Sequence, residues 1–171
     1  MNKLLKPFAL LILITSLFVA TSCLKSEENS RTEETEKTEI SNYLLTLIGT
    51  GNHIDTTASG MYYFIFTEGA GEYPQPGDTC YIEYVGYFIN GSIFDASANH
   101  HSDGIEKMVY KEKDLIPGFE EAIGLMKKGE GATFVIPSKL AYGSDWYDYI
   151  PPYTPLIFDI IQHDIKSKAV Q

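Results

Sequence analysis

The chain has 171 residues and a formal net charge of −10, with 23 acidic side chains against 13 basic ones. No basic stripe offsets this charge, and an acidic surface repels the phosphate backbone of nucleic acids, so nucleic acid is excluded as an expected partner. Two cysteines provide no disulfide framework, so folding must depend on a hydrophobic core. The length suits one domain with a tail.

The first 22 residues have the pattern of a secretory signal peptide. Lys3 and Lys6 precede the apolar stretch 7–20, and small residues then lead to Cys23. This order resembles a bacterial lipoprotein signal. We therefore expect residues 1–22 to be removed and a lipid on Cys23 to anchor the chain to a membrane of the cell envelope, most simply the outer membrane. Removal of the two lysines would change the net charge from −10 to −12. An ordinary cleaved signal with an incidental cysteine is the alternative.

The segment that follows is polar and acidic. Residues 24–39 carry almost no apolar side chains and cannot bury a core. We expect residues 23–56 to form a solvated acidic tether, with a short helix at 40–48 capped by Ser41. The sequence KSEE at 25–28 resembles acidic signals that direct lipoproteins of the Bacteroidetes to the cell surface, although a plain hydrophilic linker explains it equally well.

Alternation of apolar and polar residues predicts the strands of the folded part. The predicted strands are 62–66, 79–89, 132–136 and 156–165. The dipeptide Asn90-Gly91 predicts a hairpin turn with both residues at positive φ, and Ile93 and Phe94 begin the return strand.

One short helix is predicted late in the chain. The segment LIPG at 115–118 precedes it, and Phe119, Ala122, Ile123 and Met126 share one face at helical spacing. Lys127 and Lys128 should lie at the negative end of its dipole, with Gly129 ending it. Because one helix cannot cover both faces of a sheet, residues 57–171 are expected to form an α+β fold. In this fold an antiparallel half-barrel wraps around the helix.

Reactive side chains are scarce in this domain. The sequence has no Ser-His-Asp signature, no phosphate-binding glycine loop and no spacing typical of a metal site, so we expect neither metal nor cofactor. The pair His100-His101 lies in a polar segment, where a solvated loop is the simpler interpretation. Cys80 occupies an apolar strand pattern and is expected to be a buried, inert thiol. Aromatic side chains, in contrast, are abundant.

Five motifs occur in the order and spacing of the FKBP family, the macrolide-binding peptidyl-prolyl isomerases. They are IEYVGYF, GSIFDAS, DLIPGFEEAI, LAYG and IPPYTPLIFDI, and they span residues 60–165. The resemblance implies an FKBP-like half-barrel and a hydrophobic pocket that receives a proline ring of a polypeptide. The lipoprotein signal and acidic tether further resemble envelope FKBPs associated with gliding motility.

The resemblance also implies the residues of the pocket. Those expected to act in catalysis are Tyr84, Phe94, Asp95, Ile116, Tyr142 and Phe158; those expected to bind substrate are Leu115, Phe119 and Ile150. The Ile116 backbone N–H and the Tyr142 hydroxyl are implied to hydrogen-bond the substrate, and Tyr84 is a partner for Asp95. Without the family, the aromatic residues at strand spacing would be read as core.

Pro151 and Pro152 are expected to make the loop before the last strand rigid. Each fixes its own φ, and Pro151 biases Ile150 to an extended conformation, which should hold Ile150 at the pocket rim. A rigid entrance to the strand is the alternative role, and both roles are compatible.

Three features depart from the family pattern. Ile105 and Glu106 stand where many members place a pocket aromatic. Phe119 replaces a tryptophan, which should lower macrolide affinity more than isomerase activity. The loop 144–149 is aromatic and acidic, and either extends the site or covers the domain edge.

Two further functions remain open on the sequence. A module could grip proline-containing partners in the same pocket without turnover, as a chaperone or as part of a motility or secretion assembly. A lipid-anchored structural protein with a decayed pocket would have lost aromatics, and few are lost.

Overall fold

The computed structural model describes residues 31–112 and 114–168. The expected signal peptide and Cys23 lie outside these residues. The elements in chain order are α1 (Glu33–Gly49), β1 (Asp55–Thr56), β2 (Tyr62–Thr67), β3 (Thr79–Tyr87), β4 (Ile93–Ala96), the 3₁₀ turn η1 (Ser97–Asn99), β5 (Glu106–Val109), α2 (Pro117–Gly124), β6 (Gly131–Ile136), the 3₁₀ turn η2 (Ser138–Leu140) and β7 (Leu156–Lys166).

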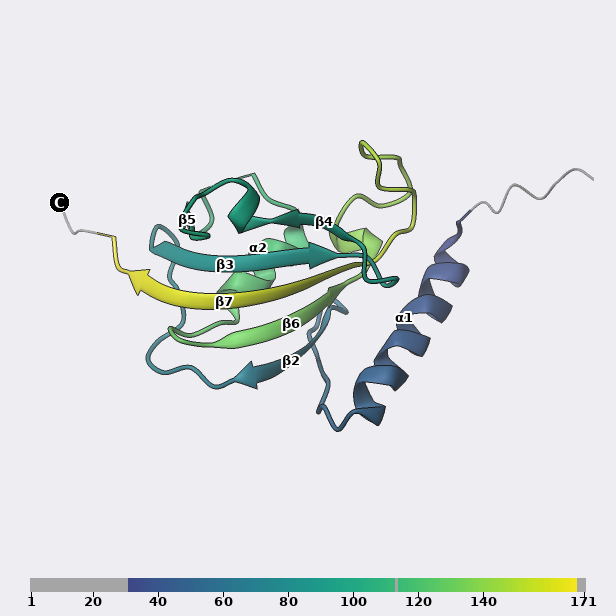
Figure 1. Cartoon of the computed structure of the whole chain (residues 1–171), viewed down its shortest axis with the longest axis horizontal. Coiled ribbons are helices and arrows are strands. Elements are labelled where there is room, and N and C mark those ends of the chain that lie inside the picture. The colour runs from purple at the N-terminus through teal and green to yellow at the C-terminus, as the bar shows by residue number, and fades with distance from the viewer. Residues whose placement is uncertain (1–30, 113, 169–171) are drawn as a thin grey trace, which may run out of the picture. The chain divides into compact units, whose positions relative to one another are not determined.

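All strands belong to one antiparallel sheet of seven strands. The order across it is β1-β2-β6-β7-β3-β4, and β5 pairs with β3 (Figure 1). Strand β3 is the most heavily paired element, because it forms ladders with β7, β4 and β5. The prediction of an α+β fold with an antiparallel sheet is confirmed.

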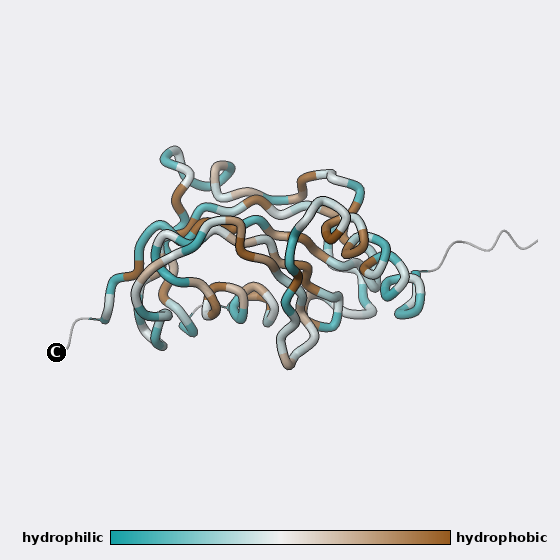
Figure 2. The backbone as a smooth tube through the Cα atoms, turned by 90° about the horizontal axis from the view of Figure 1, so that it is seen from below, coloured by the Kyte–Doolittle hydropathy of each residue, from teal (hydrophilic) through white to brown (hydrophobic). Residues whose placement is uncertain are grey.

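The main core lies between the concave face of the sheet and α2, and Figure 2 shows the arch of the sheet from below. Ile82 of β3, Phe134 of β6 and Ile160 of β7 point into this core. Ala122 and Ile123 of α2 pack against them. All five are fully or almost fully buried. Burial of each large apolar side chain contributes about 1.5–3 kcal/mol, so this face supplies most of the folding energy.

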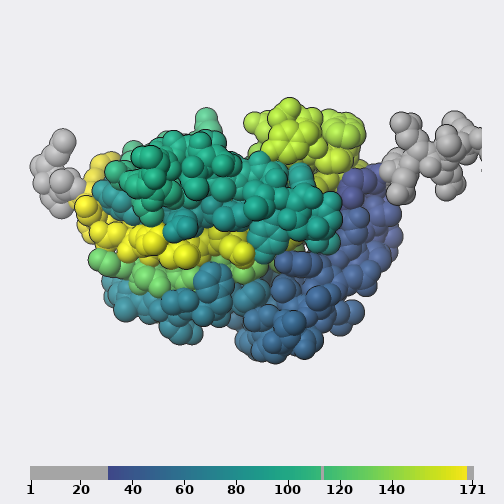
Figure 3. Space-filling view, in the orientation of Figure 1, coloured from purple at the N-terminus to yellow at the C-terminus, as the bar shows by residue number. Residues whose placement is uncertain are grey.

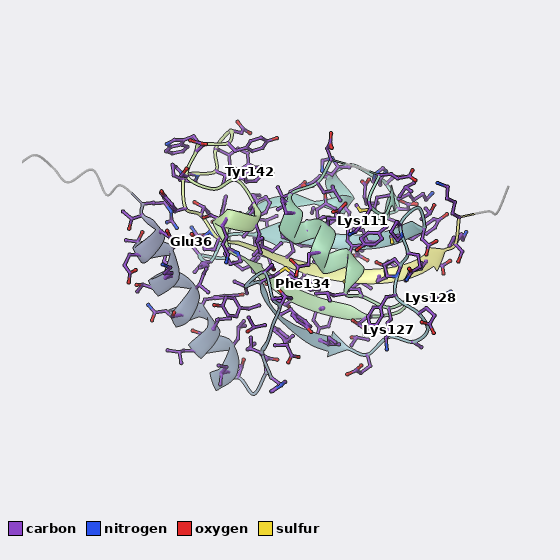
Figure 4. All side chains as sticks on the ribbon, turned by 180° about the vertical axis from the view of Figure 1, so that it is seen from behind. Glu36, Lys111, Lys127, Lys128, Phe134 and Tyr142 are labelled. Atoms are coloured by element: carbon purple, nitrogen blue, oxygen red, sulfur yellow. The ribbon has the colours of Figure 1, made fainter. Side chains whose placement is uncertain are left out.

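Helix α2 begins at Pro117, two residues before the expected start, and also ends early. Pro117 stands in its first turn, where a missing N–H costs nothing. The helix stops at Gly124, so the prediction that Lys127 and Lys128 lie in its last turn is wrong. Lys127 lies 5.0 Å from the centroid of the Tyr73 ring, and Lys128 pairs with Asp164 at 2.7 Å (Figure 4).

Helix α1 is longer than the sequence predicts. It begins at Glu33 with Thr32 as N-cap in a capping box, and not at Ser41. Residues 33–39 are therefore helical and not a solvated tether. The buried side of the helix carries Ile40, which packs on Val135 and Ile157 from the convex face of the sheet. The short helix expected at 40–48 is thus part of a longer one, and it covers part of the convex face instead of lying in a tether.

The turn between β3 and β4 differs from the expected type. Of Asn90 and Gly91, only Gly91 has a positive φ, of 84°. Phe88 O accepts from Gly91 N at 2.8 Å, and Phe88 N donates to Ser92 O at 3.0 Å. The register shifts between Gly86 and Tyr87, so the chain uses a longer turn with a bulge. The hairpin is confirmed, but its two positive φ angles are wrong.

Cys80 is a free, fully buried thiol, as predicted. Burial raises its pKa to about 11, which keeps it in the unreactive protonated form at neutral pH. Among the described residues, no helix has the length and apolar character needed to cross a bilayer.

Candidate functional site

Four aromatic rings meet at one end of the concave face. Phe158 of β7 is their centre, with ring centroids 6.1 Å from Tyr84, 5.4 Å from Phe94 and 4.8 Å from Phe119. Tyr84 and Phe158 point inward from neighbouring strands, Phe94 comes from β4, and Phe119 comes from the first turn of α2. Tilted and edge-on ring contacts of this kind stabilise an aromatic cluster beyond simple burial.

A glycine makes room for two of these rings. A Cβ on Gly86 would lie 2.7 Å from Phe94 Cζ and 2.8 Å from Phe158 Cε1, closer than a methyl group permits. Gly86 pairs with Phe158 across the β3–β7 ladder and with Asp95 across the hairpin. The absence of a side chain at this point of β3 therefore fixes how deep the two phenyl rings can sit.

A cavity of about 270 Å³ opens beside the cluster. Its lining includes the expected residues Tyr84, Leu115 and Phe119, together with His100, Glu106 and Met108. Glu106 thus lies in the wall of the cavity, at the position where many family members place an aromatic residue. The sequence did not predict His100 or Met108 in this lining. Met108 lies on β5, which has no strand signal of its own, and His100 was interpreted as a residue of a solvated loop or as a metal ligand.

Asp95 is held by three partners at the edge of the cluster. Tyr84 Oη donates to Asp95 Oδ2 at 2.9 Å, and Ala96 N donates to Oδ1 at 2.8 Å. His100 Nε2 lies 2.7 Å from the same Oδ1. The expected pairing of Tyr84 with Asp95 is present. One feature of the sequence could have indicated the pairing with His100: this histidine follows the aspartate by five residues across a short polar turn.

The turn η1 ties this edge to the sheet. Ser97 is fully buried, and its hydroxyl accepts from Tyr84 N at 3.0 Å. His101 Nε2 lies 2.6 Å from Glu106 Oε2, so the two histidines bridge η1 to Asp95 and to β5. The polar segment after β4 is therefore an ordered wall of the cavity.

Tyr84 should make folding sensitive to alkaline pH. Burial raises its pKa above the ordinary 10.0, and the hydrogen bond and charge of Asp95 raise it further. Above pH 10 the unfolded chain loses this phenolic proton while the folded chain keeps it, so the free energy of unfolding falls as pH rises. Urea denaturation between pH 8 and 11 should show a shallower fall in Tyr84→Phe than in the wild type. Identical slopes would contradict this account.

Ile116, which directly follows the cavity-lining residue Leu115, presents an unused backbone donor. It is the N-cap of α2 in an extended conformation, with φ −60° and ψ 140°, as the following proline favours. Its carbonyl accepts from Phe119 N and Glu120 N, whereas its own N–H makes no hydrogen bond among the described residues. A half-buried amide without a partner can donate to a ligand.

The loop between β6 and β7 (residues 137–155, the β6–β7 loop) overhangs this end of the sheet and carries Tyr142 and Ile150 (Figure 3). Ile150 is only 4% exposed and belongs to the core, so it lies deeper than the expected rim position. Tyr142 is half-buried, which raises its pKa, with Tyr147 and Asp95 as further causes.

The aromatic part of the loop contacts the expected site residues. The Tyr147 ring stacks on Tyr142 at 4.0 Å and 11°, and Tyr149 Oη donates to Phe94 O at 2.7 Å. Trp146 is 67% exposed. Of the two interpretations of this loop, an extension of the site is the one that these contacts favour.

A model of the family described as FKBP-type peptidyl-prolyl cis-trans isomerase matches residues 70–161. Relatives include FkpA of Escherichia coli, 35% identical over 113 residues, which are 66% of this chain and 40% of that protein. A probable FkpA of Neisseria meningitidis is 38% identical over 108 residues, covering 63% of this chain and 38% of the relative. The chain therefore spans about two-fifths of the length of these curated relatives.

Solved structures match over more of the chain. A peptidyl-prolyl cis-trans isomerase from Pseudomonas syringae has a TM-score of 0.65 at 27% identity, covering 81% of this chain and 98% of that one. The crystal structure of FkpA from Escherichia coli has a TM-score of 0.64 at 28% identity, covering 80% and 63%.

Proposed function

This chain belongs to the FKBP-type peptidyl-prolyl cis-trans isomerase family, and we propose that it is an enzyme that accelerates Xaa-Pro rotation in polypeptides. The observation that carries the proposal is the aromatic cavity, together with the N–H of Ile116 next to the lining residue Leu115, which has no hydrogen-bond partner among the described residues. Such a site offers an apolar receptacle for a proline ring and a donor for a neighbouring carbonyl.

Rotation about a prolyl bond is limited by a barrier of ~18–20 kcal/mol, because resonance gives the C–N bond double-bond character. The planar amide is stabilised in water by its charge-separated resonance form. A pocket lined by Tyr84, Phe119 and Leu115 excludes water and disfavours this form. The twisted state has lost the resonance and suffers less from desolvation, so the pocket lowers the barrier without a nucleophile.

Within this proposal each site residue has a role. Phe94 and Phe158 shape the depth of the pocket, Tyr84 and Leu115 form its wall, and Phe119 supports the ring. Ile116 N–H and Tyr142 Oη hold the substrate carbonyls. Ile150 backs the loop from within the core.

Asp95 is proposed to position other groups. Its two carboxylate oxygens already have three partners, including Tyr84 Oη and His100 Nε2. The carboxylate thereby fixes the orientation of the Tyr84 ring and ties η1 to the pocket wall.

Location, substrates and further ligands follow from the sequence. The lipoprotein-type signal supports an envelope protein anchored through Cys23, with proline-containing envelope polypeptides as substrates. Macrolides are a second ligand class for the same cavity, with lower affinity than for family members that have tryptophan at the Phe119 position.

The proposal can be tested in an assay in which chymotrypsin cleaves only the trans form of an Xaa-Pro peptide. Phe94→Ala removes a ring that contacts Phe88 and Phe158, and should lower kcat/KM by at least about tenfold, since a loss of ~1.4 kcal/mol of transition-state stabilisation has this effect. Phe66→Ala is the matched control, because Phe66 lies on β2 and is 48% exposed. A wild type without activity in this assay would overturn the proposal.

A further inference from the structure

The β6–β7 loop is attached at one end to helix α1 and at the other to Arg31, which directly precedes the N-cap Thr32 of that helix. At its start, Ser138 hydrogen-bonds Glu36; at its end, the carbonyls of Pro152 and Tyr153 accept from Arg31. The two anchors flank the segment that carries Tyr142 and the aromatic residues over the pocket. Figure 4 shows Glu36 and Tyr142 at the same end of the domain.

The first anchor is a buried carboxylate at the start of η2. Glu36 is 5% exposed; its Oε1 accepts from Ser138 N and its Oε2 from Ser138 Oγ, the latter at 2.7 Å. Removing a carboxylate from water costs free energy, so carboxylates are buried only where their oxygens are hydrogen-bonded. Both oxygens are used on a single loop residue, so the position of Ser138 is closely fixed.

Ser138 passes this constraint to the backbone on both sides of Tyr142. Its carbonyl accepts from Ala141 N and from Gly143 N, each at 2.8 Å. A displacement of Ser138 therefore moves the two peptide units that set the direction of the Tyr142 side chain.

The second anchor is Arg31. Its Nε donates to Pro152 O at 3.2 Å and its Nη2 to Tyr153 O at 3.0 Å, while Glu39 binds the other side of the guanidinium. Tyr153 N in turn donates to Gly143 O at 2.8 Å, which closes the loop. In Figure 3 the atoms of the loop meet those of the first turns of α1.

The helix can serve as an anchor because the sheet holds it. Ile40 packs with Val135 and Ile157, and Tyr43 of α1 and Tyr87 of β3 pack against the same cluster. Helix α1 lies outside the residues 70–161 that the family model matches. Through Glu36 it reaches the β6–β7 loop.

We propose that α1 braces the β6–β7 loop, with Glu36 and Arg31 as positioning residues for Tyr142. The inference rests on the proposed function in so far as Tyr142 contacts the substrate. Removal of the brace leaves the sheet and the aromatic cluster in place but allows the loop to move away from its working position.

The experiment compares three variants with the wild type by amide hydrogen exchange and by isomerase kinetics. Glu36→Ala removes both hydrogen bonds to Ser138. Glu36→Gln is the conservative variant, because its amide can accept from Ser138 N and donate to Ser138 Oγ. Tyr43→Phe is the matched control, which removes a hydroxyl where α1 packs on the sheet and leaves the loop anchors intact.

In Glu36→Ala, exchange at the amides of Ala141 and Gly143 should be at least about tenfold faster, the effect of losing one hydrogen bond to a charged group, with Phe134 in β6 unchanged. The kcat/KM should fall by about tenfold for the same reason. Glu36→Gln should stay within about threefold of the wild type, since its hydrogen bonds persist without the charge. Tyr43→Phe should leave both loop exchange and kcat/KM unchanged.

Unchanged exchange at Ala141 and Gly143 in Glu36→Ala would overturn the brace, as would equal loop effects in Tyr43→Phe. A wild type without isomerase activity would count against the proposed function alone, because the exchange data decide the brace independently of turnover.

Discussion

Replacement of Phe158 by alanine is expected to lower the free energy of unfolding by about 3–5 kcal/mol, the cost of deleting a buried phenyl ring. The ring is almost fully buried and contacts Tyr84, Phe94 and Phe119. No neighbour can collapse into the gap without breaking its other contacts. The same change should abolish isomerase activity, since three pocket rings lose their common support.

Chemical denaturation measures the stability part of this prediction. A typical domain is stable by about 5–15 kcal/mol, so the variant should remain folded in the absence of denaturant. Phe66→Ala, on the exposed side of β2, should cost far less and keep its activity. A Phe158→Ala protein that matches the Phe66→Ala control in stability would show that the cluster is not the structural centre described here.

Gly86→Ala, which adds a single methyl group, is expected to lower the isomerase activity strongly for so small a change. The added Cβ would lie within 2.8 Å of both Phe94 and Phe158, so the two rings must shift from their positions in the cluster. Misplacement of a catalytic group by about 1 Å can cost on the order of 100-fold in rate, which is the loss in kcat/KM that we expect. The accompanying loss of stability should be about 1–3 kcal/mol, as for other overpacked cores.

Gly49→Ala is the control for this change. A Cβ on Gly49 meets nothing within 4 Å, and the residue ends α1 away from the pocket. Kinetics of both variants with one Xaa-Pro peptide, together with their unfolding curves, separate an effect on the pocket from an effect on folding. Full activity in Gly86→Ala would mean that the rings have more freedom than the structure indicates.

The strands were predictable because they follow simple periodicities. β3, β6 and β7 alternate apolar and polar residues or form continuous apolar runs, and their predicted bounds agree with the structure to within two residues. The aromatic cluster was predictable from the family motifs, which put Tyr84, Phe94, Phe119 and Phe158 in register. Strand and helix spacing alone would have assigned these rings to the core; Tyr84, Phe119 and Phe158 do belong to it, and Phe94 packs against it.

The first half of α1 could not be predicted from local sequence. Glu36 is the first residue of the helix face that packs on the domain. In the sequence it is a glutamate in a charged segment, a pattern that indicates exposure to solvent. Its burial depends on Ser138, which lies 102 residues away in the chain. Strand β5 was missed for a related reason, since four residues containing Glu106 and Lys107 carry no strand signal without their partner β3.

The contacts of the β6–β7 loop were also beyond the sequence. Asp148 and Tyr153 adopt positive φ angles of 50°, which residues of these types rarely do. Asp148 lies between Tyr147, which stacks on Tyr142, and Tyr149, which donates to Phe94 O. Tertiary contacts determine these angles, so the aromatic content of the segment indicated a role without indicating which one.

The most direct test of the account is a measurement of affinity and exchange in one NMR sample of a short Xaa-Pro peptide with the purified protein. Chemical shifts give the fraction bound, and exchange cross-peaks give the rate of cis-trans rotation. The account predicts exchange that accelerates with the fraction bound and loses this acceleration in Phe94→Ala. Binding without acceleration would contradict it, and would identify the pocket as a module that grips proline and does not turn it over.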